Sequence, residues 1–167
     1  SQLARQVDSI LRMRYDRIYG VIEMNEKLFL PVRILLTLGA AEFFGPALRD
    51  SGVSHLQNPE WPGHSKVHMM WFIAYLFASG LSQIYLIWFR RPLDYGNLSI
   101  AFIWQFCNLF AFWSAVFLAP VYGGAVIDGK YHTQILGINE NILAFSIFSL
   151  LWLTGLVVFR MRSRPEC

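Results

Sequence analysis

The sequence predicts an all-α polytopic membrane protein, a four-transmembrane-helix bundle with an N-terminal amphipathic helix. Of its 167 residues, 55% are hydrophobic and 15% are charged, and the mean hydropathy is +0.40. This composition is more apolar than that of a soluble domain. The apolar residues gather into four runs, at about 28–48, 67–89, 98–119 and 142–159. Each run has about the ~20 residues that an α-helix needs to cross a bilayer, and four such runs leave no polar shell for a soluble fold.

The first 27 residues are predicted to form a cytoplasmic amphipathic segment. Their apolar residues recur at helical spacing, at Leu3, Val7, Ile10, Leu11, Ile18, Val21 and Ile22. Such a helix lies on the inner membrane surface or against a protein partner, and packing beneath the protein's own bundle is the alternative. The predicted organisation is therefore the segment 1–27, a transmembrane domain over 28–160 and a basic cytoplasmic tail over 161–167.

Positive charge predicts the orientation of the bundle. Ten of the fourteen Lys and Arg residues fall before the first span, between the second and third spans, or at the C-terminal end. By the positive-inside rule, both termini face the cytoplasm and the His-rich loops face the opposite side. The formal net charge of +3 thus reflects membrane topology. Because no basic patch interleaved with aromatic residues accompanies it, we expect no nucleic-acid partner.

The two cysteines are not expected to pair. Cys107 falls in the middle of the third apolar run and Cys167 ends the chain, so one lies in the bilayer and the other on the cytoplasmic side. No Cys-x-x-Cys redox motif is present either.

Two charged residues fall inside the first apolar run. Arg33 is near its cytoplasmic end, where a long side chain snorkels to the interface. Glu42 stands between two alanines and two phenylalanines towards the outer end. A carboxyl group in such apolar surroundings must be paired, hydrogen-bonded or protonated, which makes Glu42 the first candidate functional residue.

All four histidines fall on the predicted outer side. His55, His64 and His68 precede or begin the second span, and His132 lies in the loop before the fourth. His64 and His68 are four residues apart and share one helix face. Continuing along that face gives hydroxyl groups at Tyr75, Ser79 and Ser82.

These residues predict a polar pocket that opens outward. Gln105 and Asn108, three residues apart on the third span, are expected to form its floor, and Glu42, His64 and His68 its rim. The predicted catalytic residues are Glu42 and His68 in acid/base roles, with His64 supporting them. The predicted ligand-binding residues are Tyr75, Ser79, Gln105, Asn108, Trp61 and Glu60.

Two other interpretations use the same residues. Two histidines at i, i+4 with a carboxylate from another helix form a partial site for Zn or Fe. However, the His-x-x-x-His spacing lacks the glutamate of a metalloprotease helix, and no Glu-x-x-His pair completes a di-iron site. No cofactor or metal is therefore assigned. In the purely structural interpretation, His and Glu pair with each other while Gln105 and Asn108 bond between helices.

The stretch NPEWPGHSKVHMMW, residues 58–71, resembles a motif of a family of small uncharacterised four-span membrane proteins. Phe44-Gly45-Pro46-Ala47, His55 and the segment QILGIN at 134–139 share that resemblance. More distantly, four spans with a Pro-x-Trp lead into the second are similar to the EXPERA-type fold of sterol isomerases and the sigma-2 receptor. That resemblance implies a membrane cavity for a sterol-like or amine-bearing ligand. This chain has His68 where an acidic residue of that superfamily is expected.

The leading functional prediction is a site for a lipid-like or isoprenoid small molecule, with isomerase-type acid/base chemistry as its enzymatic form. The alternatives are a non-enzymatic accessory subunit of a larger membrane complex, with protein partners, and a His/Glu metal-binding membrane protein. A cavity lined by Glu42, His64 and His68 would favour a ligand site. Side chains paired in a closed, dry interface would favour the accessory subunit.

Overall fold

The computed structural model describes residues 26–91 and 93–162, and it confirms the all-α four-helix bundle. Four helical spans are long and apolar enough to cross a membrane: Glu26–Asp50, Gly63–Phe89, Tyr95–Val121 and Glu140–Arg162. They contain the four predicted runs and extend beyond them by up to four residues. The predicted amphipathic segment, except for its last two residues, and the last five residues of the chain lie outside the described part.

Each span contains one or two elements. The first consists of a helix over residues 26–39, a turn at Ala40 and α2 (Ala41–Asp50). The second is α3 (Gly63–Ile84), which continues into the π-helical η1 (Tyr85–Phe89). The third is α4 (Tyr95–Leu118), followed by the 3-10 helix η2 (Ala119–Val121). The antiparallel strands β1 (Gln134–Ile135) and β2 (Ile138–Asn139) precede the fourth span, α5 (Glu140–Arg162).

Local sequence explains several of these boundaries. The Asp94 side chain accepts a hydrogen bond from the backbone N–H of Asn97 at 2.8 Å, which caps the start of α4. Pro62 directly precedes α3, where its missing N–H is not needed. The turn between β1 and β2 places both Leu136 and Gly137 at positive φ, as a two-residue hairpin turn requires.

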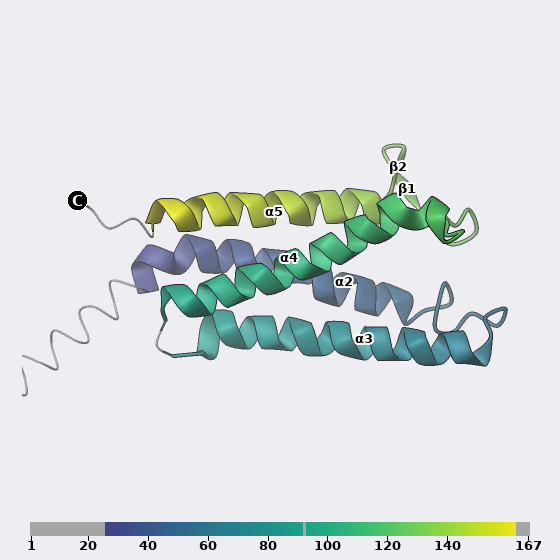
Figure 1. Ribbon diagram of the computed structural model, residues 1–167, viewed down its shortest axis with the longest axis horizontal. Helices are drawn as coiled ribbons and strands as arrows, with labels where there is room; N and C mark the ends of the chain where they lie inside the picture. Colours follow the sequence, from purple (N-terminus) through teal and green to yellow (C-terminus); the bar gives the residue numbers. More distant parts are fainter. Residues whose placement is uncertain (1–25, 92, 163–167) are drawn as a thin grey trace, which may run out of the picture.

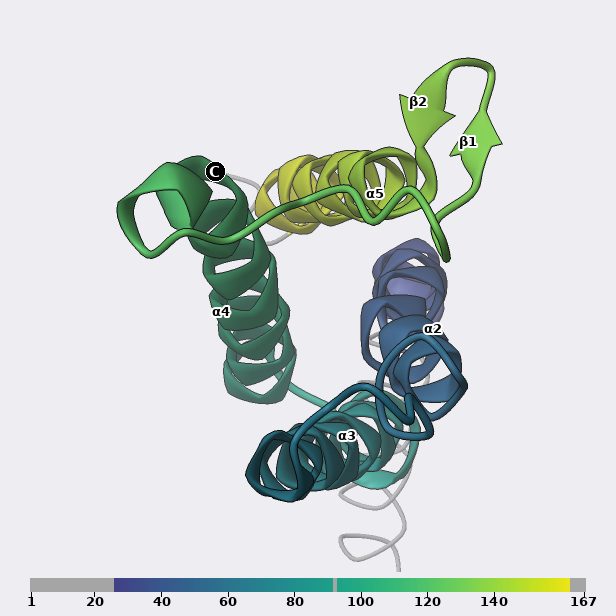
Figure 2. The same cartoon turned by 90° about the vertical axis from the view of Figure 1, so that its right-hand side faces the viewer.

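The four spans form a ring in chain order when the bundle is viewed from its loop end (Figure 2). The α2–α3 connection and the 122–139 loop lie at that same end, whereas residue 26 and the end of α5 lie at the other (Figure 1). This common placement of the two loops agrees with an even number of crossings. Which compartment each end faces stays a prediction.

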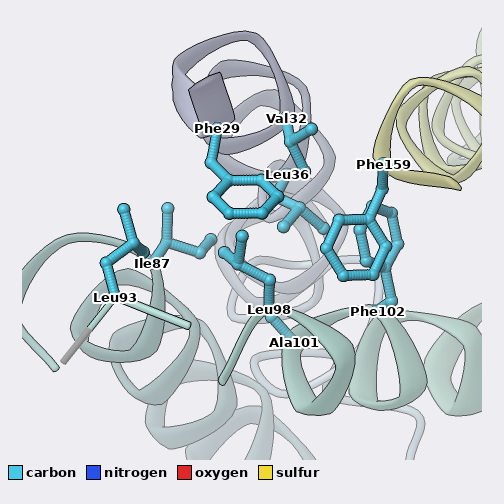
Figure 3. Close-up of a cluster of buried hydrophobic side chains, with 9 residues drawn as sticks. All are labelled: Phe29, Val32, Leu36, Ile87, Leu93, Leu98, Ala101, Phe102 and Phe159. Carbon is cyan, nitrogen blue, oxygen red and sulfur yellow. The ribbon is translucent and has the colours of Figure 1, made fainter. Parts of the chain in front are cut away.

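A hydrophobic cluster closes the bundle at the end opposite the loops (Figure 3). It combines all four spans through Phe29, Val32, Leu36, Ile87, Leu93, Leu98, Ala101, Phe102 and Phe159. Arg33 is buried beside this cluster. Its Nε donates to the carbonyl of Ile87 at 3.0 Å, and its guanidinium lies 4.0 Å from the centre of the Trp88 ring. The Arg33 side chain is therefore used to join the first and second spans, and its predicted snorkelling to the interface stays a prediction.

A second, smaller cluster joins α2 to α3 near the middle of the bundle. It contains Ala40, Phe43, Ala47, Ile73 and Leu76. By contrast, many large apolar side chains point outward along the spans, including Leu81, Phe110 and Leu150, each more than 60% exposed. Such exposure is expected where acyl chains rather than water surround the helices.

Candidate functional site

An open cavity of about 390 Å³ lies at the loop end of the bundle and is lined by all four spans. Its walls are mainly apolar, with Phe72 and Leu76 from α3, Phe112 and Val116 from α4, and Phe145 from α5. Polar side chains occupy the deep end and the mouth. The volume falls within the roughly 300–1,000 Å³ typical of small-molecule sites, and the mixed lining is also typical of them.

Glu42 lies at the deep end of this cavity. It shares one face of α2 with Pro46 and Asp50, at i, i+4 and i+8, and all three line the cavity. The Glu42 side chain is only 1% exposed, and its Oε1 has no hydrogen-bond partner among the described residues. Pro46 also lacks the N–H that would donate to the Glu42 carbonyl in a regular helix. A buried polar atom without a partner is costly, so a hydrogen-bond donor that reached this oxygen would stabilise the protein.

Asn108 is the second polar group at the deep end. It lies close enough to Glu42 for the two side chains to interact, yet its Nδ2 has no hydrogen-bond partner either. The deep end therefore places a carboxyl group from α2 beside an amide from α4, close enough to interact, with Glu42 Oε1 and Asn108 Nδ2 both buried. Asn108 was predicted on the floor of a pocket and Glu42 on its rim; both line this cavity, and they lie next to each other at its deep end.

Gln105 lies outside the cavity lining. Its Nε2 donates to the carbonyl of Leu36 at 2.7 Å, which holds α4 against the first span. Gly39 makes this approach possible, because a Cβ added there would lie 2.8 Å from Gln105 Oε1. Gln105 is thus an interhelical contact rather than part of the floor, and its Oε1 is itself buried without a partner.

The two histidines that line the cavity are His55 and His132, at its mouth beside the loops. His55 Nδ1 lies 3.3 Å from an Asp50 carboxyl oxygen, and its ring stacks on that of His132 with centroids 6.5 Å apart. The backbone N–H of Asp128 donates to His132 Nδ1 at 3.0 Å, so a neutral His132 carries its hydrogen on Nε2. That nitrogen lies 3.5 Å from Asn141 Nδ2, so the Asn141 amide must turn its oxygen towards the ring to accept from it.

Arg49 holds the two loops together beside this mouth. It forms an ion pair with Glu140 at 3.0 Å and donates to the Tyr131 carbonyl at 2.6 Å and to Ser54 Oγ at 3.1 Å. These contacts join the end of α2 to the 122–139 loop and to the start of α5. The cavity mouth is therefore built on a fixed frame rather than on two independent loops.

A more exposed pair links the same loops further out. Lys130 and Glu60 form an ion pair at 2.9 Å, and Glu60 raises the pKa of Lys130 above its usual range. Because both side chains are exposed, this pair adds little to stability.

His64 and His68 do not line the cavity, and the predicted rim is wrong in this respect. Both are exposed on the first turns of α3, with their Nε2 atoms 3.0 Å apart. The reason is the packing of α3, which runs along α2, so that its cavity-lining residues are Phe72 and Leu76, deeper in the bundle. The 122–139 loop supplies the mouth residues instead.

The remaining predicted ligand-binding residues lie around the cavity without lining it. Tyr75 is 51% exposed on the outside of α3, whereas Ser79 is buried and its Oγ has no partner in the described part of the chain. Trp61 packs edge-on against His55 with ring centroids 5.2 Å apart. Glu60 is used in the pair with Lys130.

The mouth residues Asp50, His55, His132 and Asn141 were not predicted as site residues. The only signal in the sequence was that every histidine falls on one side of the membrane. Which two of the four come together depends on a contact between loops 77 residues apart, and spacing along the chain carries no information on it.

No group of three or more His, Cys, Asp or Glu in residues 26–91 and 93–162 is arranged to hold a metal ion. The metal-binding alternative therefore gains no support from the described residues. No family model, curated protein or solved structure matches the chain. The two family resemblances thus stay predictions.

Proposed function

We propose that the protein binds a lipid-like or isoprenoid small molecule in the loop-end cavity. The observation that carries this proposal is Glu42, a cavity-lining residue whose buried carboxyl oxygen Oε1 has no hydrogen-bond partner among the described residues. The apolar walls suit a hydrocarbon body, and the deep polar end suits a single polar group. The resemblance to the EXPERA-type fold is in keeping with such a ligand.

The polar group that best fits the deep end is a hydroxyl. A hydroxyl both donates and accepts, so one group satisfies Glu42 Oε1 as donor and Asn108 Nδ2 as acceptor. A carbonyl would satisfy only the amide. We therefore propose a lipid-like alcohol as the preferred ligand class.

The enzymatic form of the proposal uses Glu42 as the group that moves a proton to or from the ligand. The histidines at this cavity are His55 and His132, so they replace His64 and His68 as partners in such chemistry. His55 is already paired with Asp50, an arrangement that orients its ring.

The binding proposal is tested by identifying co-purified lipid with mass spectrometry and by titrating the delipidated protein with it. Glu42→Leu and Asn108→Leu remove the two polar atoms, and we expect each to weaken binding by about tenfold or more. His68→Ala is the matched control, since its side chain lies outside the cavity. Unchanged binding in both cavity variants would refute the site. For the enzymatic form, Glu42→Gln should retain binding and lose turnover.

The accessory-subunit alternative makes the opposite prediction. It expects no stoichiometric lipid and no effect of the cavity variants on the purified protein. The cavity between all four spans favours the ligand site, because a subunit with only a structural role has no need of an open polar interior.

A further inference from the structure

A second hollow, which we call the aromatic groove, runs along the outside of the bundle between α4 and α5. It has a volume of about 360 Å³ and is lined by five aromatic side chains, Tyr95, Phe102, Phe106, Trp152 and Phe159. Arg160 stands at one end of it. This groove shares no lining residue with the loop-end cavity and lies nearer the opposite end of the bundle.

The aromatic groove is a firm surface. The Phe102 and Phe159 rings form its buried base with centroids 5.2 Å apart, and Phe159 stacks on Tyr95 at 4.6 Å. The Trp152 ring is held by a hydrogen bond from its Nε1 to the carbonyl of Phe102 at 2.9 Å. Because these contacts fix the rings, the groove exists before anything binds in it.

The length of the groove matches one leaflet of a bilayer. Along α4 it extends from Tyr95 to Phe106, which at 1.5 Å per residue is about 16 Å. The hydrocarbon core is about 30 Å thick, so one leaflet spans about 15 Å. Arg160 and Tyr95 are at the end of their spans, where lipid headgroups lie, and Phe106 is near the middle of the third span.

The charge at the headgroup end selects the kind of lipid. Among the described residues, three arginines at this end are used by the protein: Arg33 donates to the carbonyl of Ile87 at 3.0 Å, Arg91 pairs with Glu26 at 2.7 Å, and Arg162 donates to the carbonyl of Leu28 at 2.8 Å. Arg160 has no hydrogen bond or ion pair with any of the described residues. None of the described residues that line the groove is acidic, so none of them would pair with the ammonium group of a zwitterionic lipid.

We propose that the aromatic groove binds an anionic glycerophospholipid, with an acyl chain along the rings and the phosphate at Arg160. An arginine is well suited to this role because its planar guanidinium binds phosphate oxygens in pairs. The binding is independent of the ligand in the loop-end cavity.

The test uses Trp152 as a reporter inside the groove. The protein is reconstituted into vesicles of ordinary phosphatidylcholine. Into these vesicles we add increasing fractions of a lipid with brominated chains, either phosphatidylglycerol or phosphatidylcholine. Brominated chains quench the fluorescence of a tryptophan that they contact. Subtracting the signal of a Trp152→Phe variant isolates Trp152 from the other tryptophans. We expect half-maximal quenching of Trp152 at a fraction of brominated phosphatidylglycerol about fivefold lower than that of brominated phosphatidylcholine.

Three variants test whether the preference for the anionic lipid depends on Arg160. Each is measured both with Trp152 and with Trp152→Phe. Arg160→Gln should abolish the preference, and Arg160→Lys should keep only part of it, because an ammonium group does not bind two phosphate oxygens in the same way. Arg90→Gln removes an exposed charge from the same end outside the groove and should change nothing. Equal quenching by both lipids in the unaltered protein would overturn the proposal, whether or not the variants fold. So would an Arg160→Gln protein that keeps the preference, or an equal loss in Arg90→Gln.

Discussion

Single buried polar residues in this bundle divide into those that have partners and those that do not. Glu42 belongs to the second group, and its burial was predictable because the residues on both sides of it are apolar. Its neighbour across the bundle was predictable only in part. Asn108 lines the cavity with it, whereas Gln105, three residues away on the same helix, is turned to the Leu36 carbonyl. The rotation of α4 about its axis decides which of these two residues faces the cavity. That rotation is set by packing between helices and leaves no pattern in the sequence.

This division predicts opposite effects for the same type of substitution. In delipidated protein, Glu42→Leu should raise the free energy of unfolding by about 1–3 kcal/mol, because it removes an unsatisfied buried group. Asn139→Leu should lower it by about 1–2 kcal/mol, since Asn139 Oδ1 accepts the N–H groups of Asn141 and Ile142 at the start of α5. Thermal unfolding followed by circular dichroism in detergent compares the two. Destabilisation by both would mean that the Glu42 carboxyl has a partner.

At the scale of elements, hydropathy predicts where spans lie but not how each is built. The first span is divided by a turn at Ala40, and the second ends in the π-helical η1, yet both belong to uninterrupted apolar runs. Apolar residues satisfy a bilayer in either helical form, so these irregularities depend on contacts between helices. One such contact between helices is at Gly80, which lets α3 approach α2 closely.

The closeness of α2 and α3 can be tested at Gly80. A Cβ added there would lie 2.5–2.8 Å from atoms of the Phe44 ring, so the ring or the helix must shift. We expect Gly80→Ala to destabilise the protein by about 1–3 kcal/mol through overpacking. Gly63→Ala at the start of α3 is the matched control. A Cβ there meets nothing within 4 Å, and alanine should stabilise α3 by up to about 1 kcal/mol. Equal effects in thermal unfolding would show that Gly80 has no special packing role.

At the scale of the whole molecule, the presence of four spans followed directly from composition, whereas their arrangement as a ring and the two hollows on it did not. The cavity arises where the loop over residues 122–139 and His55 meet above α2 and α4. The groove arises because α4 and α5 carry aromatic residues on adjoining faces. Both features depend on which spans are neighbours, and four similar apolar runs contain no signal for that.

The orientation of the bundle remains to be tested, and the structure makes the test simple. Both loops that frame the cavity lie at one end, so a single exposed position in each end reports the whole topology (Figure 1). In a background with Cys107 and Cys167 replaced by serine, we would introduce Gln134→Cys at the loop end and Arg90→Cys at the other. The positive-inside rule predicts that a membrane-impermeant maleimide labels position 134 in intact cells and position 90 only after permeabilisation. The reverse pattern would place the cavity mouth, with His55 and His132, on the cytoplasmic side, and its ligand would then enter from that side.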